Sequence, residues 1–89
     1  RDYNTVDILH RISKCIPANS GLRLTIASIS PTEILLEGEA PKSQAVTQFS
    51  LNLKKSNDLI AYEWSPGAPR QSNRGWEFTH TAAIPVITP

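Results

Sequence analysis

The chain has 89 residues, of which 39% are hydrophobic and 19% charged, and its formal net charge is +1. This length predicts one domain with a modest core and little room for an enclosed active site. The composition excludes a disordered chain, and the balanced charge gives no reason to expect nucleic acid or an anionic membrane as the partner.

Cysteine content and apolar runs set further bounds. The single cysteine, Cys15, excludes an intramolecular disulfide and leaves the compartment open. No apolar run approaches the ~20 residues needed to cross a bilayer, and no signal peptide is recognisable. The chain begins with Arg1 and contains no methionine. We therefore expect a fragment of a longer protein, in which the lack of a targeting segment means little.

The first helix is predicted over residues 4–16. Asn4 is a good N-cap, and Asp7 follows it by three residues, close to a capping box. The apolar residues recur at helical spacing and form one face, made of Ile8, Leu9, Ile12, Cys15 and Ile16. Pro17 ends the helix, and residues 19–21 form a loop.

An antiparallel hairpin is predicted from a strand over residues 22–29, a turn at residues 30–32 and a second strand that begins at Glu33. Both strands alternate in polarity, so each has a buried and a wetter face. The predicted buried residues are Leu22, Leu24, Ile26, Ile34 and Leu36. The predicted outward residues are Arg23, Thr25, Ala27, Glu33, Leu35 and Glu37.

The second helix is predicted over residues 42–55. Pro41 suits a helix entry, and Lys54 and Lys55 suit the negative end of the helix dipole. The apolar stripe of this helix consists of Ala45, Val46, Phe49 and Leu53.

Two more strands complete the domain. The third covers roughly residues 59–64, a polar loop covers residues 65–74, and the fourth strand covers residues 75–83, with Trp76, Phe78 and His80 on one face. We expect a single domain over residues 1–84 and a tail over residues 85–89.

The order of these elements, α-β-β-α-β-β, predicts the fold. A right-handed crossover through the second helix makes the second and third strands parallel. The fourth strand contains no proline, which suits a central position between them, antiparallel to both. The sequence therefore predicts an α+β protein: a ferredoxin-like two-layer sandwich in circularly permuted order, with both helices on one face of a four-stranded antiparallel sheet.

Most of the chain resembles a known family. The run ILLEGEAPKSQAVTQFSLNLKKS, followed by LIAYEW, a polar loop and GWEFTHTAAI, resembles the C-terminal periplasmic domain of the PilN family of type IV pilus assembly proteins. It is similar also to the GspL family of type II secretion. The shared pattern is a strand, Gly38, a helix with Phe49 and Leu53, a short strand and an aromatic-rich strand. The upstream segment ILHRISKCIPANSGLRLTIASI resembles the family's helix, proline and first strand.

This resemblance implies a scaffold with no catalytic residues and no cofactor. The chain would be the periplasmic domain of an inner-membrane protein, in the assembly platform of a pilus or secretion system. It would form a homodimer, or a heterodimer with a similar platform subunit, and would bind no nucleic acid. Its membrane helix and coiled coil would precede Arg1, so contact with the membrane lies outside this chain.

Gly38 raises the question of a phosphate site, because it stands between a strand and a helix start. A phosphate-binding loop needs several backbone N–H groups, usually from a glycine-rich run. Here Glu37 and Glu39 flank a single glycine and would repel phosphate. We expect a structural glycine that allows a bend or a close backbone approach at the strand end. Glu33, Glu37 and Glu39 are expected to share a solvated face of the strand. That face is too wet for acid–base catalysis, which needs buried carboxyl groups, but it could complement a basic partner.

Candidate catalytic and metal-binding residues carry weak signals. His10 falls off the apolar stripe of its helix and is expected to be exposed, whereas His80 is expected to be partly buried. Two histidines without other ligands at metal-binding spacing are poor evidence for a metal. Cys15 is expected to act as a small buried hydrophobe. We therefore predict no enzyme, no metal and no cofactor.

The aromatic residues and the basic residues raise the question of nucleic-acid binding. Tyr62, Trp64, Trp76 and Phe78 could stack on bases only from the open face of the sheet, beside basic residues. The strand pattern directs them toward the helices, so we expect core packing. Arg70 and Arg74, with Lys54 and Lys55, could form a small basic patch, although such charges are usually solvated.

The predicted interface lies on the first strand and the uncovered face of the sheet, because an exposed edge offers backbone groups to another chain. Its residues are Arg23, Thr25, Ala27, Leu35 and Glu37. Two alternatives remain: a small-ligand regulatory domain, with the loop at residues 65–74 as its site, and an acyl-phosphate-type hydrolase, for which the loop lacks a glycine-rich cradle.

Overall fold

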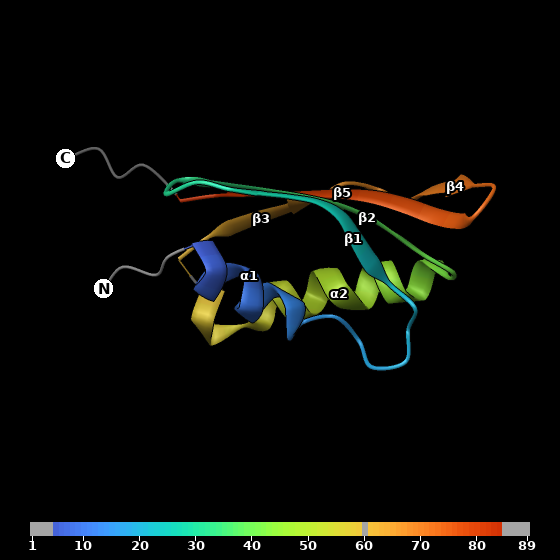
Figure 1. Cartoon of the computed structure of the whole chain (residues 1–89), viewed down its shortest axis with the longest axis horizontal. Helices are drawn as coiled ribbons and strands as arrows, with labels where there is room; N and C mark the ends of the chain where they lie inside the picture. The colour runs from blue at the N-terminus through green and yellow to red at the C-terminus, as the bar shows by residue number, and fades with distance from the viewer. Residues whose placement is uncertain (1–4, 60, 85–89) are drawn as a thin grey trace.

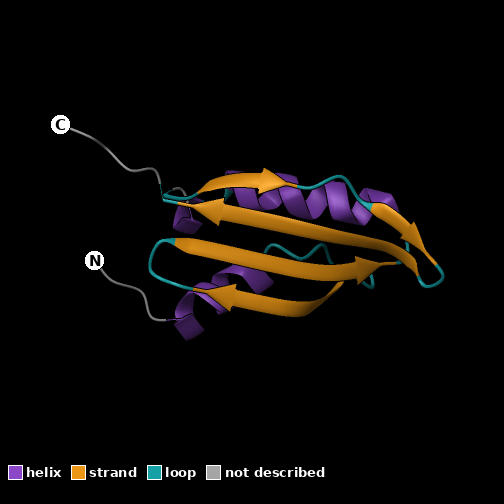
Figure 2. Cartoon of the chain, turned by 90° about the horizontal axis from the view of Figure 1, so that it is seen from above, coloured by secondary structure: helices purple, strands orange, loops and turns teal. Residues whose placement is uncertain are grey.

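The structure is a computed structural model that describes residues 5–59 and 61–84. Two helices lie against one face of a single sheet and leave the other face uncovered (Figures 1 and 2). The described residues therefore form an α+β domain with two helices and an open antiparallel sheet of five strands. The elements are α1 (Thr5–Ser13), β1 (Arg23–Ile29), β2 (Glu33–Ala40), α2 (Ser43–Lys55), a 3₁₀ turn η1 (Asn57–Leu59), β3 (Glu63–Pro66), β4 (Arg70–Ser72) and β5 (Gly75–Ala83).

The strand order is β1-β2-β5-β3, with β4 also paired to β5, and every pairing is antiparallel. The last strand lies between the second and third, as the crossover argument predicts, and its bounds are those expected from the sequence. β2 and β3 are parallel to each other because both run antiparallel to β5. Figure 2 shows the strands side by side in this order, with the helices behind them.

The prediction of four strands is wrong, because β4 forms inside the expected polar loop. Ser72 pairs with Gly75 across a tight turn, and Gly75 has a φ of 123°, which glycine adopts without strain. Arg70 pairs with Glu77 one step further along. A short segment held by a tight turn has too little periodicity to be recognised in the sequence.

Two other boundaries differ from the prediction. The third strand begins at Glu63, because the preceding residues form 3₁₀-type turns in which Leu59 N–H bonds to the Ser56 carbonyl and Tyr62 N–H to that of Leu59. The first helix ends at Ser13, where hydrogen bonds shorten to the i+3 type. Its predicted N-cap, Asn4, and the predicted tail over residues 85–89 lie outside the described residues.

The core fills the space between the helices and the sheet. α2 contributes Val46, Phe49 and Leu53, all at most 1% exposed, at the predicted helical spacing. Leu36 of β2 and Ile12 of α1 are fully buried against them. The inclusion of Leu9 in the apolar face of α1 is wrong: its side chain is 39% exposed, since it lies about 100° around the helix from Ile8.

A bulge in β1 changes which residues face the helices. The pairing with β2 shifts between Leu24 and Ile26, so Thr25 is the extra residue. Ile26 then pairs with Glu37 and faces away from the helices, 48% exposed, and Ala27 pairs with the buried Leu36. The predicted inward position of Ile26 and outward position of Ala27 are therefore wrong, because one inserted residue exchanges the two faces.

Candidate functional site: the open face of the sheet

The side of the sheet that no helix covers is here called the open face. Its residues follow from the register, because directly paired residues share a face and the alternate residues of β2, such as Ile34 and Leu36, are buried against the helices. The open face consists of Arg23, Ile26, Ser28, Glu33, Leu35, Glu37, Glu39, Glu63, Ser65, Arg70, Glu77, Thr79, Thr81 and Ala83.

Every glutamate in the sequence lies on this open face. Glu33, Glu37 and Glu39 share it at a period of two along β2, as predicted. Glu77 on β5 lies opposite Glu39, and Glu63 on β3 pairs with Ala83 of β5. The alternation that directs Trp76 and Phe78 inward was the sequence signal that could have placed Glu77 here.

Two arginines offset part of this charge in one row across the sheet. Arg23 donates hydrogen bonds from Nε and Nη2 to Oε1 of Glu39, at 3.0 and 2.6 Å. Arg70 on β4 reaches Oε1 of Glu77 at 3.3 Å. The register places Arg23, Glu39, Glu77 and Arg70 in that order across four strands. Exposed ion pairs contribute only about 0–1 kcal/mol each, so this row sets the charge pattern of the face more than its stability.

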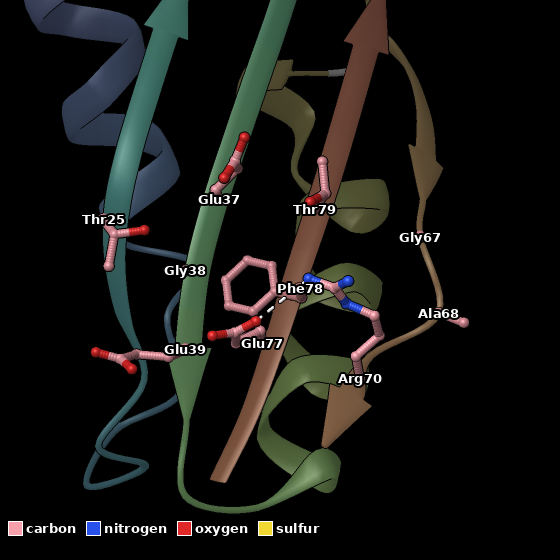
Figure 3. Close-up of a pocket in the computed structure, with 10 residues that line it drawn as sticks. All are labelled: Thr25, Glu37, Gly38, Glu39, Gly67, Ala68, Arg70, Glu77, Phe78 and Thr79. Atoms are coloured by element: carbon pink, nitrogen blue, oxygen red, sulfur yellow. Dashed lines mark hydrogen bonds and ion pairs between the residues drawn. The ribbon is translucent and has the colours of Figure 1, made fainter. Parts of the chain in front are cut away.

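A shallow hollow of about 220 Å³ lies within the open face. Figure 3 shows Glu37 and Glu39 on one side of it, Glu77 and Arg70 near the middle, and the Gly67–Ala68 segment along the edge. Carboxylates outnumber cations in its lining. The hollow therefore suits cationic or hydrogen-bonding groups better than anions.

The predicted interface residues occupy different positions on this surface. Arg23, Leu35 and Glu37 lie on the open face; Leu35 and Glu37 are half-buried and Arg23 is exposed. Thr25 is the bulge residue and lines the hollow. Ala27 is exposed at the edge strand, although it faces the helix side. The sequence did not identify Ile26 as a surface residue, because the bulge carries no recognisable sequence signal.

The two edges of the sheet differ in how they would receive another strand. The β3–β4 edge is interrupted by residues 67–69 and carries Pro66 and Pro69, which have no N–H to donate. β1 is continuous over Arg23–Ile29 and contains no proline, although its bulge perturbs the strand. Backbone pairing with a partner strand is therefore easier at β1.

Gly38 lies inside β2, not at a strand end, and its role is to allow close packing. An added Cβ would lie 2.5 Å from the carbonyl oxygen of Arg23 and 2.6 Å from Cζ of Phe78. The ring of Phe78, which pairs with Gly38 across the strands, occupies the space that a side chain would need. This accords with the predicted structural role through close approach.

His80 is more deeply buried than predicted, with 1% of its surface exposed. Its ring lies 4.7 Å from that of Phe78 and 5.8 Å from that of Phe49, measured between centroids. Neither ring nitrogen has a hydrogen-bond partner. Burial lowers the pKa of His80, although nearby backbone groups of Thr79 and Val46 oppose this shift.

The other candidates lie apart from one another. His10 is exposed on α1, and Cys15 is buried, with Sγ near the carbonyl oxygens of Arg11 and Asn52. The proposed basic patch does not form: Arg70 lies on the open face, whereas Lys54 and Lys55 end α2 on the helix side. These positions bring no nucleophile and base together.

The aromatic residues turn toward the helices as predicted. Trp64, Trp76 and Phe78 share the face of Leu36 by register, and Tyr62 packs near Trp64 with centroids 6.4 Å apart.

Across residues 5–59 and 61–84, no group of His, Cys, Asp and Glu is arranged to hold a metal ion. In the same part of the chain, no helix has the length and apolar character of a membrane span.

A scan against protein-family models and a search of curated proteins found no match to this chain.

Proposed function

We propose that this chain is a non-catalytic interaction domain that pairs with itself or with a similar subunit through the open face. The domain belongs to an assembly platform in the inner membrane, of the kind that builds type IV pili or type II secretion systems. Within that platform the domain is periplasmic. Support for this placement comes from the resemblance of the strand–Gly38–helix pattern to the PilN and GspL families.

The observation that carries the pairing role is the composition of the open face. A half-buried Leu35 and a 48%-exposed Ile26 lie there among charged and hydroxyl side chains. Ile26 pairs with Glu37 and Leu35 with Ser28 of β1, so the two apolar side chains are diagonal neighbours. An apolar centre within a polar rim is the usual anatomy of a protein interface.

The finer fold assignment is part of the same proposal. We assign the chain to a circularly permuted ferredoxin-like sandwich, in which β1, β2, β5 and β3 are the four principal strands and β4 extends the β3 edge. The strand order and the position of both helices on one face support this assignment.

Sedimentation velocity over a wide concentration range tests the pairing role, alone and with candidate platform subunits. Leu35→Glu places a charge at the apolar centre and is expected to weaken whichever association is observed. Val6→Glu is the matched control, since Val6 is 73% exposed on α1, on the opposite side of the molecule. If Leu35→Glu leaves every association unchanged, the open face is not the interface.

A small-ligand regulatory domain is the second candidate, and the hollow favours it. Gly67, Ala68 and Arg70, from the segment expected to bind such a ligand, form one side of its 220 Å³. Titration with free amino acids, followed by backbone amide chemical shifts, separates the two functions. Shifts confined to the hollow would favour ligand binding, whereas the scaffold role predicts none.

A further inference from the structure

The charges of this domain are segregated between its two layers. Every glutamate lies on the open face, where Arg23 and Arg70 offset part of the charge. Every lysine lies on or beside a helix and is exposed: Lys14 follows α1, Lys42 precedes α2, and Lys54 and Lys55 end α2. The two layers therefore carry complementary charge, although the whole chain is nearly neutral.

The helix layer also presents an apolar residue beside these lysines. Leu51 of α2 is 42% exposed, because it lies on the opposite side of the helix from Phe49 and Leu53. Lys55 follows it by four residues and so lies one turn along the same side. Gln44, Gln48, Leu51, Lys54 and Lys55 are here called the outer face of α2, and all five are exposed.

The dimensions of the two surfaces match. α2 has 13 residues, which gives a length of about 20 Å. β2 has 8 residues, which gives about 26 Å. A helix of this length already lies along the other face of the same sheet (Figure 1). The open face can therefore accept a second helix in the same layered manner.

We infer that the open face of one copy binds the outer face of α2 of a second copy, with the glutamates beside Leu35 opposite Lys54 and Lys55. This orientation rests on the proposed function, because it specifies how the pairing surface is used. The two surfaces in contact are different, so each bound copy still has its other surface free. Such a heterologous interface extends into rings or open chains of copies and does not stop at a dimer.

Charge argues against the symmetrical alternative. Two open faces packed on each other would bring Glu33 and Glu37 of one copy toward the same glutamates of the other. Like charges brought together across an interface oppose association. Pairing of two β1 edges would instead depend on backbone hydrogen bonds and would end at a dimer. The heterologous contact is therefore distinguished from both by its stoichiometry and its dependence on salt.

The wild-type chain provides the first test, in sedimentation velocity at rising concentration and at two salt concentrations. We expect the average mass to pass that of a dimer at 50 mM salt. At 500 mM salt the association constant should fall by about tenfold or more. The electrostatic screening length is ~10 Å at 0.1 M salt and is shorter still at 500 mM, so the attraction between the two charged surfaces weakens. Association that ends at a dimer, or that is insensitive to salt, would overturn the inference.

Two charge-reversed variants provide the second test. The sheet variant carries Glu33→Lys and Glu37→Lys, and the helix variant carries Lys54→Glu and Lys55→Glu. Each alone should associate about tenfold more weakly than the wild type, since attraction is replaced by repulsion. An equimolar mixture should recover the association with equal numbers of the two variants, because the intact sheet of one variant meets the intact helix of the other and the two reversed surfaces are also oppositely charged.

Arg74→Glu is the control, because Arg74 is exposed in the turn before β5, outside both surfaces. Circular dichroism verifies that each variant folds, and the wild-type salt series does not depend on the variants. A mixture that associates no better than its components would refute the heterologous contact. A wild-type chain that stays monomeric alone, but binds a platform subunit through Leu35, would also refute it while leaving the proposed function in place.

Discussion

Replacing His80 with leucine probes the only histidine buried in the described part of the chain. Its ring packs beside those of Phe49 and Phe78, and neither nitrogen has a hydrogen-bond partner. Burial is the main cause that lowers its pKa from the usual 6.5. The folded protein therefore holds this imidazole neutral at a pH at which the unfolded chain binds a proton.

The sign of the pH dependence follows from this difference. Below pH 6.5 the unfolded chain binds more protons at this site than the folded one, so acid favours unfolding. The part of the free energy of unfolding that depends on a neutral His80 is fully present above pH 6.5. It is lost as the pH falls toward the lowered pKa of His80 in the folded chain. The slope reaches at most about 1.4 kcal/mol per pH unit.

Urea unfolding of the wild type and of His80→Leu, at several pH values between 7.5 and 5, measures this effect. The variant should lose the histidine-dependent slope, and at pH 7.5 it should be about 1–3 kcal/mol more stable, because two unsatisfied nitrogens leave the core. His10→Gln, at an exposed position, should keep the wild-type slope. Parallel profiles for the wild type and His80→Leu would refute the neutral state of the buried ring.

The remaining predictions concern packing and surface charge. Gly38→Ala should cost about 1–3 kcal/mol, since its Cβ meets both a backbone oxygen and the ring of Phe78, and thermal unfolding should shift down by several degrees. In a Phe78→Leu background the same change should cost less, and an unchanged melting temperature for Gly38→Ala alone would contradict the close packing. Arg23→Ala should change stability by less than about 1 kcal/mol in the same assay, because its pair with Glu39 is exposed on the arginine side.

Much of the fold could be predicted from periodicity. The bounds of β5 agree with the prediction, and those of α2 agree to within one residue, because both elements repeat apolar residues at a regular spacing. The central position of β5 followed from the handedness of the crossover. The bulge at Thr25 and the short β4 could not be predicted, because their geometry depends on neighbouring strands.

The candidate surface was only partly visible in the sequence. Alternation along β2 placed its glutamates and Leu35 on the face away from the helices. Ile26 was expected inside, since alternation assumes a strand without a bulge. The burial of His80 was underestimated because the contacts that enclose it come from Phe49 on α2, which is distant in the chain.

The sequence by itself determined the α+β class, the two amphipathic helices and the alternating faces of the strands, because these depend on local spacing. Tertiary structure decided where those faces meet. It gathered glutamates from three strands onto one surface and left the lysines on the other layer, since pairing register and layer packing depend on contacts between distant residues. The charge asymmetry of this domain, from which the orientation of its partner is inferred, therefore exists only in the folded chain.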